Sequence, residues 1–452
     1  MVKKRVIISV LLTIGAVIGT YKMWHHTSPL LLISILILSF LLAYKMTAYV
    51  ADFKTIGNHS RIDIIFLLIF CVFLCIPASH ISDAKKAKNE NRYLASKAIF
   101  IKNKKLNLNY GKDFNNWFND RFSMRNNLIR WNTILKCNIN SNYCTNGKVT
   151  YYKKGHFIYG NIFGMEKIKE NKQEVLNTYA GNINRLQNYC DKNNIKLYIL
   201  IIPRQSDFFD YPLADKRKYE PDNADEVIDY LLKKTKTHII YPKEAMMEAN
   251  KETPVYFKTD HHWTKKGAYV GYYELMKEIR KDFPTAPVLE ESSLEKYYDN
   301  RISEWWNREF NYGQKFIQLG LPRKYAKKIL DTPYLYYKNP NREKLQTDIR
   351  FAPIPKKGYD SKQDNQFYYP DGLDKKVMVI GNSFAANLVE FLPYSFKYTA
   401  RYYDNYRYML LETYKEVFDE YKPDILIINM FSSYTNGLLN LYPNKYRWKE
   451  VK

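Results

Sequence analysis

Cysteine is scarce in this sequence, with five residues among 452, too few for a disulfide framework. No cysteines or histidines have zinc-finger spacing and no basic helix has base-reading character, which disfavours nucleic acid binding. Cys71 and Cys75 lie in an apolar run, where structural thiols are expected. Cys137 and Cys144 could close a small loop if that stretch lies outside the cytoplasm, or could remain two unpaired thiols.

Acidic residues are also fewer than basic ones. The chain has 46 Asp and Glu against 70 Lys and Arg, for a formal net charge of +24. A balance this basic suits nucleic acid, anionic lipid headgroups or an acidic polymer. The lysines are interleaved with Asn, Tyr and Asp instead of being gathered into one arm, which is typical of solvated faces. The charge alone therefore names no partner.

Long apolar runs are confined to the first 80 residues. They cover about 6–23, 29–49 and 62–78, and each is near the length of roughly 20 residues that crosses a bilayer. The first run could instead be a signal peptide, but no convincing small-residue cleavage site follows it. We expect three transmembrane helices within residues 1–80, with two or fewer as the alternative.

The side on which the rest of the chain lies is less well determined. Six basic residues flank one side of the three runs and five flank the other, so the positive-inside rule does not decide. Lys85, Lys86 and Lys88, after the third run, argue mildly for a cytoplasmic side. Three spans from a cytoplasmic N-terminus nevertheless place the later residues outside. We expect a multi-pass protein of the cell membrane with its large C-terminal domain extracytoplasmic.

Helical and strand-like segments alternate in the second half of the chain. Continuous apolar runs of this length, bounded by helices or turns, are typical of buried parallel strands. The alternation predicts an α/β fold of three layers around a mostly parallel sheet. The expected helices are 173–190, 224–232, 267–279 and 405–420, and the expected strands are 197–202, 238–241, 377–380 and 424–429.

Other stretches have a different texture. Residues 93–135 have a helical pattern, and 149–152 and 156–159 look like strands. Tyr, Trp, Asn, Pro and Lys dominate an insertion at about 281–375, where the aromatic side chains either pack the insertion or stack on the sugars of an anionic glycan. We therefore divide the chain into a membrane region (1–80), a linker with a helical lead-in (81–148) and a catalytic domain (149–452) that contains the insertion.

A candidate nucleophile follows one of the predicted strands. Gly381-Asn382-Ser383 comes directly after the apolar run 377–380, and α/β sheets place active groups at such strand ends. Gly381 permits a sharp turn. The backbone N–H of Ser383 would lie near a helix start, where it could stabilise an oxyanion. Asn429, at the end of the last strand, is a further candidate for this pocket.

A candidate base lies far away in the sequence. Residues i and i+2 of an extended segment share a face, so Asp260 could orient His262, and His262 could take a proton from Ser383. Asp260 could instead bind a metal with His261 or His262, although no further Cys/His cluster completes such a site. A buried, hydrogen-bonded histidine is the third interpretation, and the spacing leaves all three open.

The stretch 257–264, which reads Phe-Lys-Thr-Asp-His-His-Trp-Thr, resembles the signature of the DHHW proteins and of the SGNH hydrolase-like polysaccharide O-acetyltransferases of the alginate AlgJ/AlgX type. That family's motif usually reads Asp-Thr-His-Trp, so Asp260 and His262 match it and His261 falls on the variable position. The family's Gly-Asp-Ser turn is similar to Gly-Asn-Ser at 381–383. The order Asp, His, Ser implies a circularly permuted SGNH-like domain.

The resemblance implies a membrane-anchored O-acyltransferase, in the first place an O-acetyltransferase, acting on an extracytoplasmic polysaccharide. Ser383 would be the nucleophile, His262 the general base and Asp260 the residue that orients His262, with no metal and no cofactor. A multi-spanning membrane acyltransferase partner would supply the acetyl group. The alternatives are an SGNH-type carbohydrate esterase and a non-catalytic glycan-binding or assembly subunit. The sequence names neither the glycan nor the acyl group.

Overall fold

The protein is described by a computed structural model. The described residues are 81–87, 92–102, 104–122, 124–139, 143–146, 149–152, 156–159, 172–208, 223–258, 261–299, 332–347, 349–355, 364–404, 410–432, 437–438 and 441. The three apolar runs expected to span a membrane lie outside them, as does Asp260. In the part that is described, no helix is both long enough and apolar enough to cross a bilayer. The predicted domain bounds stay a prediction.

The chain divides into two compact units, Met1–Leu135 with Gln318–Gly320 and Lys136–Ile317 with Leu321–Lys452. The first unit contains two short antiparallel strand pairs followed by helices. Only the later part of the predicted helical segment 93–135 is helical, because the regular spacing of its aromatic residues begins at Tyr110. The elements are β1 (Lys86–Ala87), β2 (Arg92–Tyr93), β3 (Ile101–Lys102), β4 (Lys105–Leu106), α4 (Tyr110–Arg121) and α5 (Arg125–Ile139).

The second unit is built on a six-stranded sheet in the order β12-β14-β13-β15-β8-β9. Every neighbouring pair is parallel except β12 and β14 at one edge, so the predicted mostly parallel α/β fold is confirmed. The strands are β8 (Lys196–Ile202), β9 (His238–Ile240), β12 (Asn365–Tyr368), β13 (Leu373–Gly381), β14 (Phe396–Tyr403) and β15 (Ile425–Phe431).

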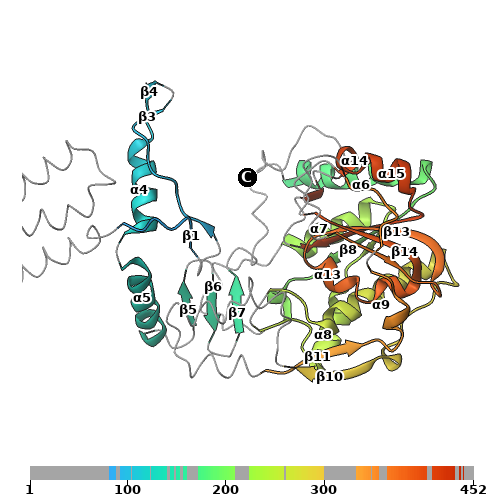
Figure 1. The fold of residues 1–452 in the computed structure, drawn as a ribbon. Helices are drawn as coiled ribbons and strands as arrows, with labels where there is room; N and C mark the ends of the chain where they lie inside the picture. Colours follow the sequence, from blue (N-terminus) through green and yellow to red (C-terminus); the bar gives the residue numbers. More distant parts are fainter. Residues whose placement is uncertain are drawn as a thin grey trace, which may run out of the picture. The chain divides into compact units, whose positions relative to one another are not determined.

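Helices cover both faces of this sheet. Figure 1 shows α6 and α15 on one side, and α8, α9 and α13 on the other. Residues 405–409 of the predicted helix at 405–420 lie outside the described part, and the rest forms two short helices, α14 and α15. The helix α8 and the strand β14 were not predicted. The bounds are α6 (Lys172–Lys192), α7 (Asn223–Lys234), α8 (Lys243–Glu252), α9 (Lys265–Asp282), α13 (Ala385–Leu388), α14 (Leu410–Thr413) and α15 (Lys415–Tyr421).

Two smaller sheets belong to the same unit. β10 (Glu295–Asp299) and β11 (Tyr334–Lys338) form an antiparallel ribbon in the predicted insertion. Tyr334 and Tyr336 are buried there, as expected for packing, whereas Tyr298 is 64% exposed. β5 (Tyr143–Asn146), β6 (Val149–Tyr152) and β7 (His156–Tyr159) form a three-stranded antiparallel sheet, which confirms both predicted strands.

Two of the five cysteines were considered as a possible disulfide pair, and a third is buried. The side chains of Cys137 and Cys144 lie outside the described part, so their pairing stays a prediction. Cys190 is buried on α6, and burial, together with the charge of Asp191, raises the pKa of its thiol to about 12. Cys190 is therefore a structural thiol that is not ionised at neutral pH.

Two helical glycines predict opposite effects of the same substitution. A Cβ at Gly181, in the middle of α6, would meet only the Arg185 guanidinium at 3.6 Å or more. A Cβ at Gly271, in α9, would lie 2.6 Å from the buried ring of Trp263. We expect Gly181→Ala to raise the free energy of unfolding by about 0.5–1 kcal/mol and Gly271→Ala to lower it by about 1–3 kcal/mol.

Urea unfolding of both variants beside the unsubstituted chain measures this difference. Each substitution adds one methyl group to a helix interior, so each is the control for the other. Equal shifts of the unfolding midpoint would contradict the packing of Trp263 against α9.

Candidate active site

Ser383 lies on a tight turn between β13 and α13. β13 ends at Gly381, where a Cβ would come within 2.9 Å of the Ala385 Cβ and of two Asn429 atoms. Only glycine lets β15 and the start of α13 approach so closely. The Asn382 side-chain oxygen accepts a hydrogen bond from the backbone N–H of Phe384 at 3.1 Å. Asn382 thus closes the turn as an aspartate could, because either side chain offers an oxygen at that position.

His262 lies in a closed loop just before α9. Tyr256 and Trp263 form an antiparallel bridge across the base of the loop, and the backbone N–H of Phe257 donates to the carbonyl of His262 at 3.2 Å. Thr264 then caps α9, its hydroxyl accepting a hydrogen bond from the N–H of Gly267 at 3.2 Å. The backbone of His262 and of the two residues that follow it is therefore held by hydrogen bonds.

The structure brings His262 and Ser383 together. The Nε2 atom of His262 lies 2.7 Å from the Oγ atom of Ser383. The His262 side chain is completely buried, whereas Ser383 is partly exposed. A partly exposed serine in hydrogen-bond contact with a shielded imidazole is the arrangement in which a histidine can activate a serine.

A group of side chains ties the two motifs to each other. The indole N–H of Trp263 donates to the carbonyl of Phe384 at 3.2 Å. The Asn387 amide donates to the carbonyl of Trp263 at 3.3 Å and accepts from the Lys265 ammonium at 3.0 Å. Lys265 also pairs with Glu390. These bonds join the residues after His262 to the residues after Ser383, so they set the separation of the base and the hydroxyl.

Removing the Asn387 amide should therefore weaken the serine–histidine contact. Asn387 is 2% exposed, and its loss would leave the Lys265 ammonium and the Trp263 carbonyl without this partner. We expect Asn387→Ala to cost about 1–3 kcal/mol of stability. We also expect kcat for an acyl ester to fall about tenfold or more with little change in KM, because small displacements of reacting groups are costly.

The matched control is Asn184→Ala, since Asn184 also donates its amide to a backbone carbonyl, that of Lys234, at 3.1 Å. Kinetics of the folded protein separate the two variants. A kcat unchanged by Asn387→Ala would show that the bonds between the motifs do not position the site.

The end of β8 supports the same loop from another direction. The Gln205 amide donates to the carbonyl of Phe257 at 2.6 Å, and the Tyr256 hydroxyl donates to the carbonyl of Pro203. Both bonds are buried. The apolar run 197–202 predicts the strand but gives no sign of these contacts, because a glutamine after a strand is common and its partner lies 52 residues away.

Aromatic rings enclose His262. Its ring lies 4.0 Å from the ring of His261 and 4.8 Å from that of Phe384, measured between centroids. Phe384 in turn stacks on Phe431 at 4.6 Å. His261 is partly exposed, in contrast to His262. These contacts restrict rotation of the His262 ring.

Asn429 lies beside the nucleophile turn. It is aligned with Gly381 across β13 and β15, and its side chain is completely buried. Because side chains alternate along a strand, Asn429 shares a face with Ile427 and Phe431, the face that α9 covers.

Asp260 lies outside the described residues, so its predicted role in orienting His262 stays a prediction. No group of metal-binding side chains occurs in the described part of the chain.

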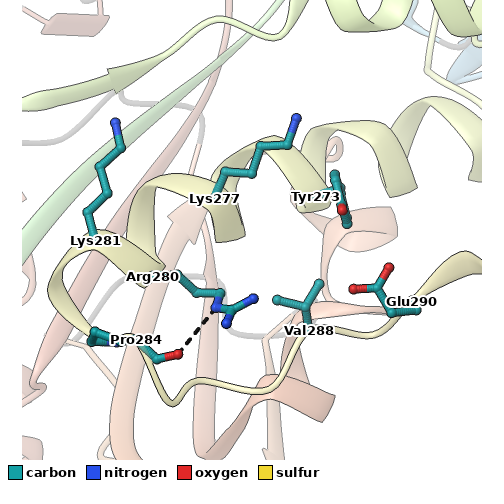
Figure 2. A pocket seen from close by; sticks show the side chains of 7 residues that line it. All are labelled: Tyr273, Lys277, Arg280, Lys281, Pro284, Val288 and Glu290. Atoms are coloured by element: carbon teal, nitrogen blue, oxygen red, sulfur yellow. Dashed lines mark hydrogen bonds between the residues drawn. The ribbon is translucent and has the colours of Figure 1, made fainter.

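A separate pocket lies along the second half of α9 (Figure 2). Its lining includes Tyr273, Lys277, Arg280 and Lys281. Glu274 and Glu278 pair with the two lysines, so the pocket has little unbalanced charge. The helix has 18 residues and is therefore about 27 Å long. Since His262 precedes its N-terminus, this pocket lies toward the end of α9 that points away from the serine–histidine pair.

The structure places the serine–histidine pair at the carboxyl edge of a mostly parallel sheet that has helices on both faces. Residues 162–301 match a family model described as "SGNH hydrolase-like domain, acetyltransferase AlgX". This match, which covers residues 162–301 of the chain, confirms the resemblance found in the sequence. The match includes His262 and ends before Ser383.

The solved structures found by comparison are distant from this chain. A DHHW family protein from Eubacterium siraeum has a TM-score of 0.45 and 14% identity, covering 68% of this chain and 97% of that one. Bacillus cereus PatB1 with a sulfonyl adduct has a TM-score of 0.43 and 15% identity, covering 66% and 97%. The O-acetyltransferase domain of Pseudomonas putida AlgJ has a TM-score of 0.41 and 13% identity, covering 66% and 94%. No curated protein matches the chain significantly.

Proposed function

We propose that this protein is a membrane-anchored O-acetyltransferase that transfers an acetyl group to a hydroxyl of an extracytoplasmic polysaccharide. The observation that carries the proposal is the 2.7 Å contact between His262 Nε2 and Ser383 Oγ, with Ser383 open to a reactant. The match of residues 162–301 to a domain described as acetyltransferase AlgX supports acetyl as the group transferred.

The first half of the reaction acetylates the enzyme. Ser383 Oγ attacks the carbonyl carbon of an acetyl ester or thioester while His262 Nε2 takes the hydroxyl proton. The backbone N–H of Ser383 stabilises the oxyanion that forms, with Asn429 near it. The leaving group departs with the proton from His262, which leaves acetyl-Ser383. Asp260, two residues before His262 in the sequence, holds the imidazole in the required tautomer.

The second half transfers the acetyl group to the sugar. A sugar hydroxyl loses its proton to His262 as its oxygen attacks the acetyl carbonyl, and Ser383 Oγ then leaves and recovers that proton. The bond made to the sugar oxygen replaces the bond to serine, so nothing is oxidised or reduced. The residues named are sufficient for both steps, and the sequence of proton transfers returns the enzyme to its starting state.

The setting of the reaction follows from the first 80 residues. Their three apolar runs would anchor the chain, and the second unit would face the extracytoplasmic side, where the polysaccharide is. An acetyl donor must reach that side, and a multi-spanning membrane acyltransferase is the partner that would deliver it.

A carbohydrate esterase is the second candidate. The partial exposure of Ser383 is equally compatible with it, because water can approach the acetylated serine as a sugar hydroxyl can. An acetyl-ester reporter distinguishes the two. We expect acetyl-Ser383 to accumulate, detected by intact mass and peptide mapping, and to decay faster when a polysaccharide is added, with acetyl appearing on the glycan. Fast release to water that glycan does not change would assign the esterase.

A further inference from the structure

Five apolar side chains are exposed on one hairpin of the first unit. We call residues 99–102 and 104–108, which contain β3 and β4, the apolar hairpin. Its exposed apolar side chains are those of Ile99 (57% exposed), Phe100 (56%), Ile101 (63%), Leu106 (58%) and Leu108 (90%). Single exposed apolar residues are common, but a group of this size within ten residues indicates a surface that binds something apolar.

The apolar hairpin is firmly held in place. Ile101 pairs with Leu106 across its two strands. The backbone N–H of Asn107 donates to the carbonyl of Phe100 at 2.9 Å, and the Asn107 amide donates to the Asp113 carboxylate at 3.0 Å. The ring of Phe100 packs edge-on against Tyr110 at 5.1 Å. The exposed side chains are therefore presented at the N-terminal end of α4.

Positive charge surrounds the same apolar side chains. Four exposed lysines flank or interrupt them, at positions 97, 102, 104 and 105. Residues 81–122 as a whole contain ten Lys and Arg but four Asp and Glu. None of the four lysines forms an ion pair with a described residue. Apolar side chains ringed by lysines suit the interface of a membrane with anionic headgroups.

The other end of α4 is fastened to the chain that follows the third apolar run. The backbone N–H of Ser82 donates to the carbonyl of Arg121 at 2.9 Å. The Arg121 guanidinium donates to the carbonyl of Ser82 at 2.9 Å and to that of Ala95 at 3.1 Å. The run 62–78 ends just before this point. A bilayer crossed by that run would lie close to the C-terminal end of α4.

A row of aromatic rings connects the two ends of α4. Tyr110, Phe114, Phe118 and Phe122 follow each other at intervals of four residues, with centroids 6.0–6.1 Å apart. The 12 residues of α4 span about 18 Å. If α4 lies along a membrane surface, both its fastened end and the apolar hairpin can reach that surface.

We propose that the apolar hairpin inserts into the headgroup layer of a membrane that contains anionic phospholipid, so that α4 lies along the surface. The lysines contact lipid phosphates, and the side chains at 99–101, 106 and 108 enter the boundary of the acyl chains. This contact is separate from acyl transfer and does not depend on Ser383 or His262.

Photo-crosslinking of the full-length chain tests this contact. The photoreactive residue p-benzoylphenylalanine would replace Leu108, and in a control Leu232, on vesicles of phosphatidylglycerol and phosphatidylcholine carrying an alkyne-tagged lipid. Leu232 is a matched control because it is 50% exposed and lies beside Lys233, Lys234 and Lys236. We expect about fivefold or more lipid adduct at position 108 than at 232.

The contribution of charge is measured in the same assay. Combining Lys102→Gln, Lys104→Gln and Lys105→Gln, or using phosphatidylcholine alone, should lower the adduct at 108 about fivefold. The control, Lys233→Gln with Lys234→Gln and Lys236→Gln, should leave it unchanged. Equal lipid adduct at 108 and 232, adduct insensitive to lysine removal, or crosslinks from 108 to protein in place of lipid would each overturn the proposal.

Discussion

Ser383→Ala is expected to abolish acetyl-enzyme formation and to lower acetyl transfer by about 10³-fold or more, because it removes the hydroxyl that lies 2.7 Å from His262 Nε2. The substitution removes one oxygen from a partly exposed side chain, so the unfolding midpoint should change little. Intact-mass measurement after exposure to an acetyl donor shows whether the acetylated form appears.

The control for this substitution is Ser293→Ala. Ser293 lies in an exposed turn, where its hydroxyl donates to the carbonyl of Glu290 at 2.7 Å, and its loss should leave transfer unchanged. Normal acetylation of the Ser383→Ala variant would eliminate both the transferase and the esterase mechanism. It would place the acetyl group on a residue other than Ser383.

His262→Ala and His261→Ala should differ sharply, although the two residues are adjacent and their rings lie 4.0 Å apart. His262 carries the nitrogen at 2.7 Å from the serine hydroxyl. We expect its removal to lower kcat by about 10³-fold. Removal of His261 deletes a partly exposed ring that packs against Phe384, and we expect an effect of about tenfold at most.

The rate of acetyl transfer by each variant is measured at several pH values, and unfolding curves show whether each variant is folded. A large loss of kcat in both variants with normal folding would show that the two imidazoles act together. A large loss of kcat in His261→Ala alone would show that His261, and not His262, is the base.

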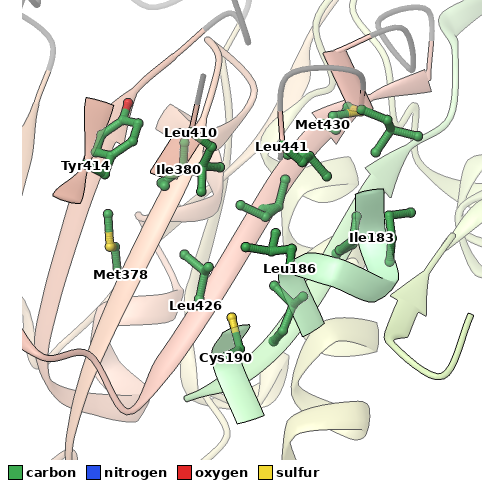
Figure 3. Close-up of a cluster of buried hydrophobic side chains, with 14 of the residues drawn as sticks. Ile183, Leu186, Cys190, Met378, Ile380, Leu410, Tyr414, Leu426, Met430 and Leu441 are labelled. Carbon is green, nitrogen blue, oxygen red and sulfur yellow. The ribbon is translucent and has the colours of Figure 1, made fainter. Parts of the chain in front are cut away.

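The central strands could be predicted from the sequence because burial on both faces requires continuous apolar runs. The predicted strand 197–202 is Lys196–Ile202, and 424–429 is Ile425–Phe431. Figure 3 shows the reason: Met378 and Ile380 of β13 point into the cluster formed with Ile183 and Leu186 of α6. Val377 and Val379, which alternate with them along the strand, pack on the opposite face of the sheet.

The strand β14 was not predicted, because its sequence is not a continuous apolar run. Lys397, Thr399 and Arg401 interrupt its apolar residues, so it does not look like a strand buried on both faces. In the sheet, Thr399 and Arg401 are nevertheless buried beside Val377 and Val379 of β13. Burial of Arg401 is tolerated because its guanidinium donates to the Asn365 side chain at 3.0 Å, a partner that lies on a neighbouring strand.

By itself the sequence determined the chemical groups at the site and the strand ends that carry them. An apolar strand that runs into Gly-Asn-Ser and a loop that reads Asp-His-His-Trp are local features, readable from composition and spacing. The family motif already favoured His262 over His261, whereas the contact of His262 with Ser383 was decided by the tertiary structure.

The physical reason is that His262 and Ser383 are 121 residues apart in the chain. Their separation depends on how α9 packs against the sheet and on the bonds of Trp263, Lys265 and Asn387. These bonds are specific to one three-dimensional arrangement, since a buried lysine or asparagine is stable only where its partners converge. The local pattern therefore supplied the serine and the imidazole, and packing across the sheet placed them 2.7 Å apart.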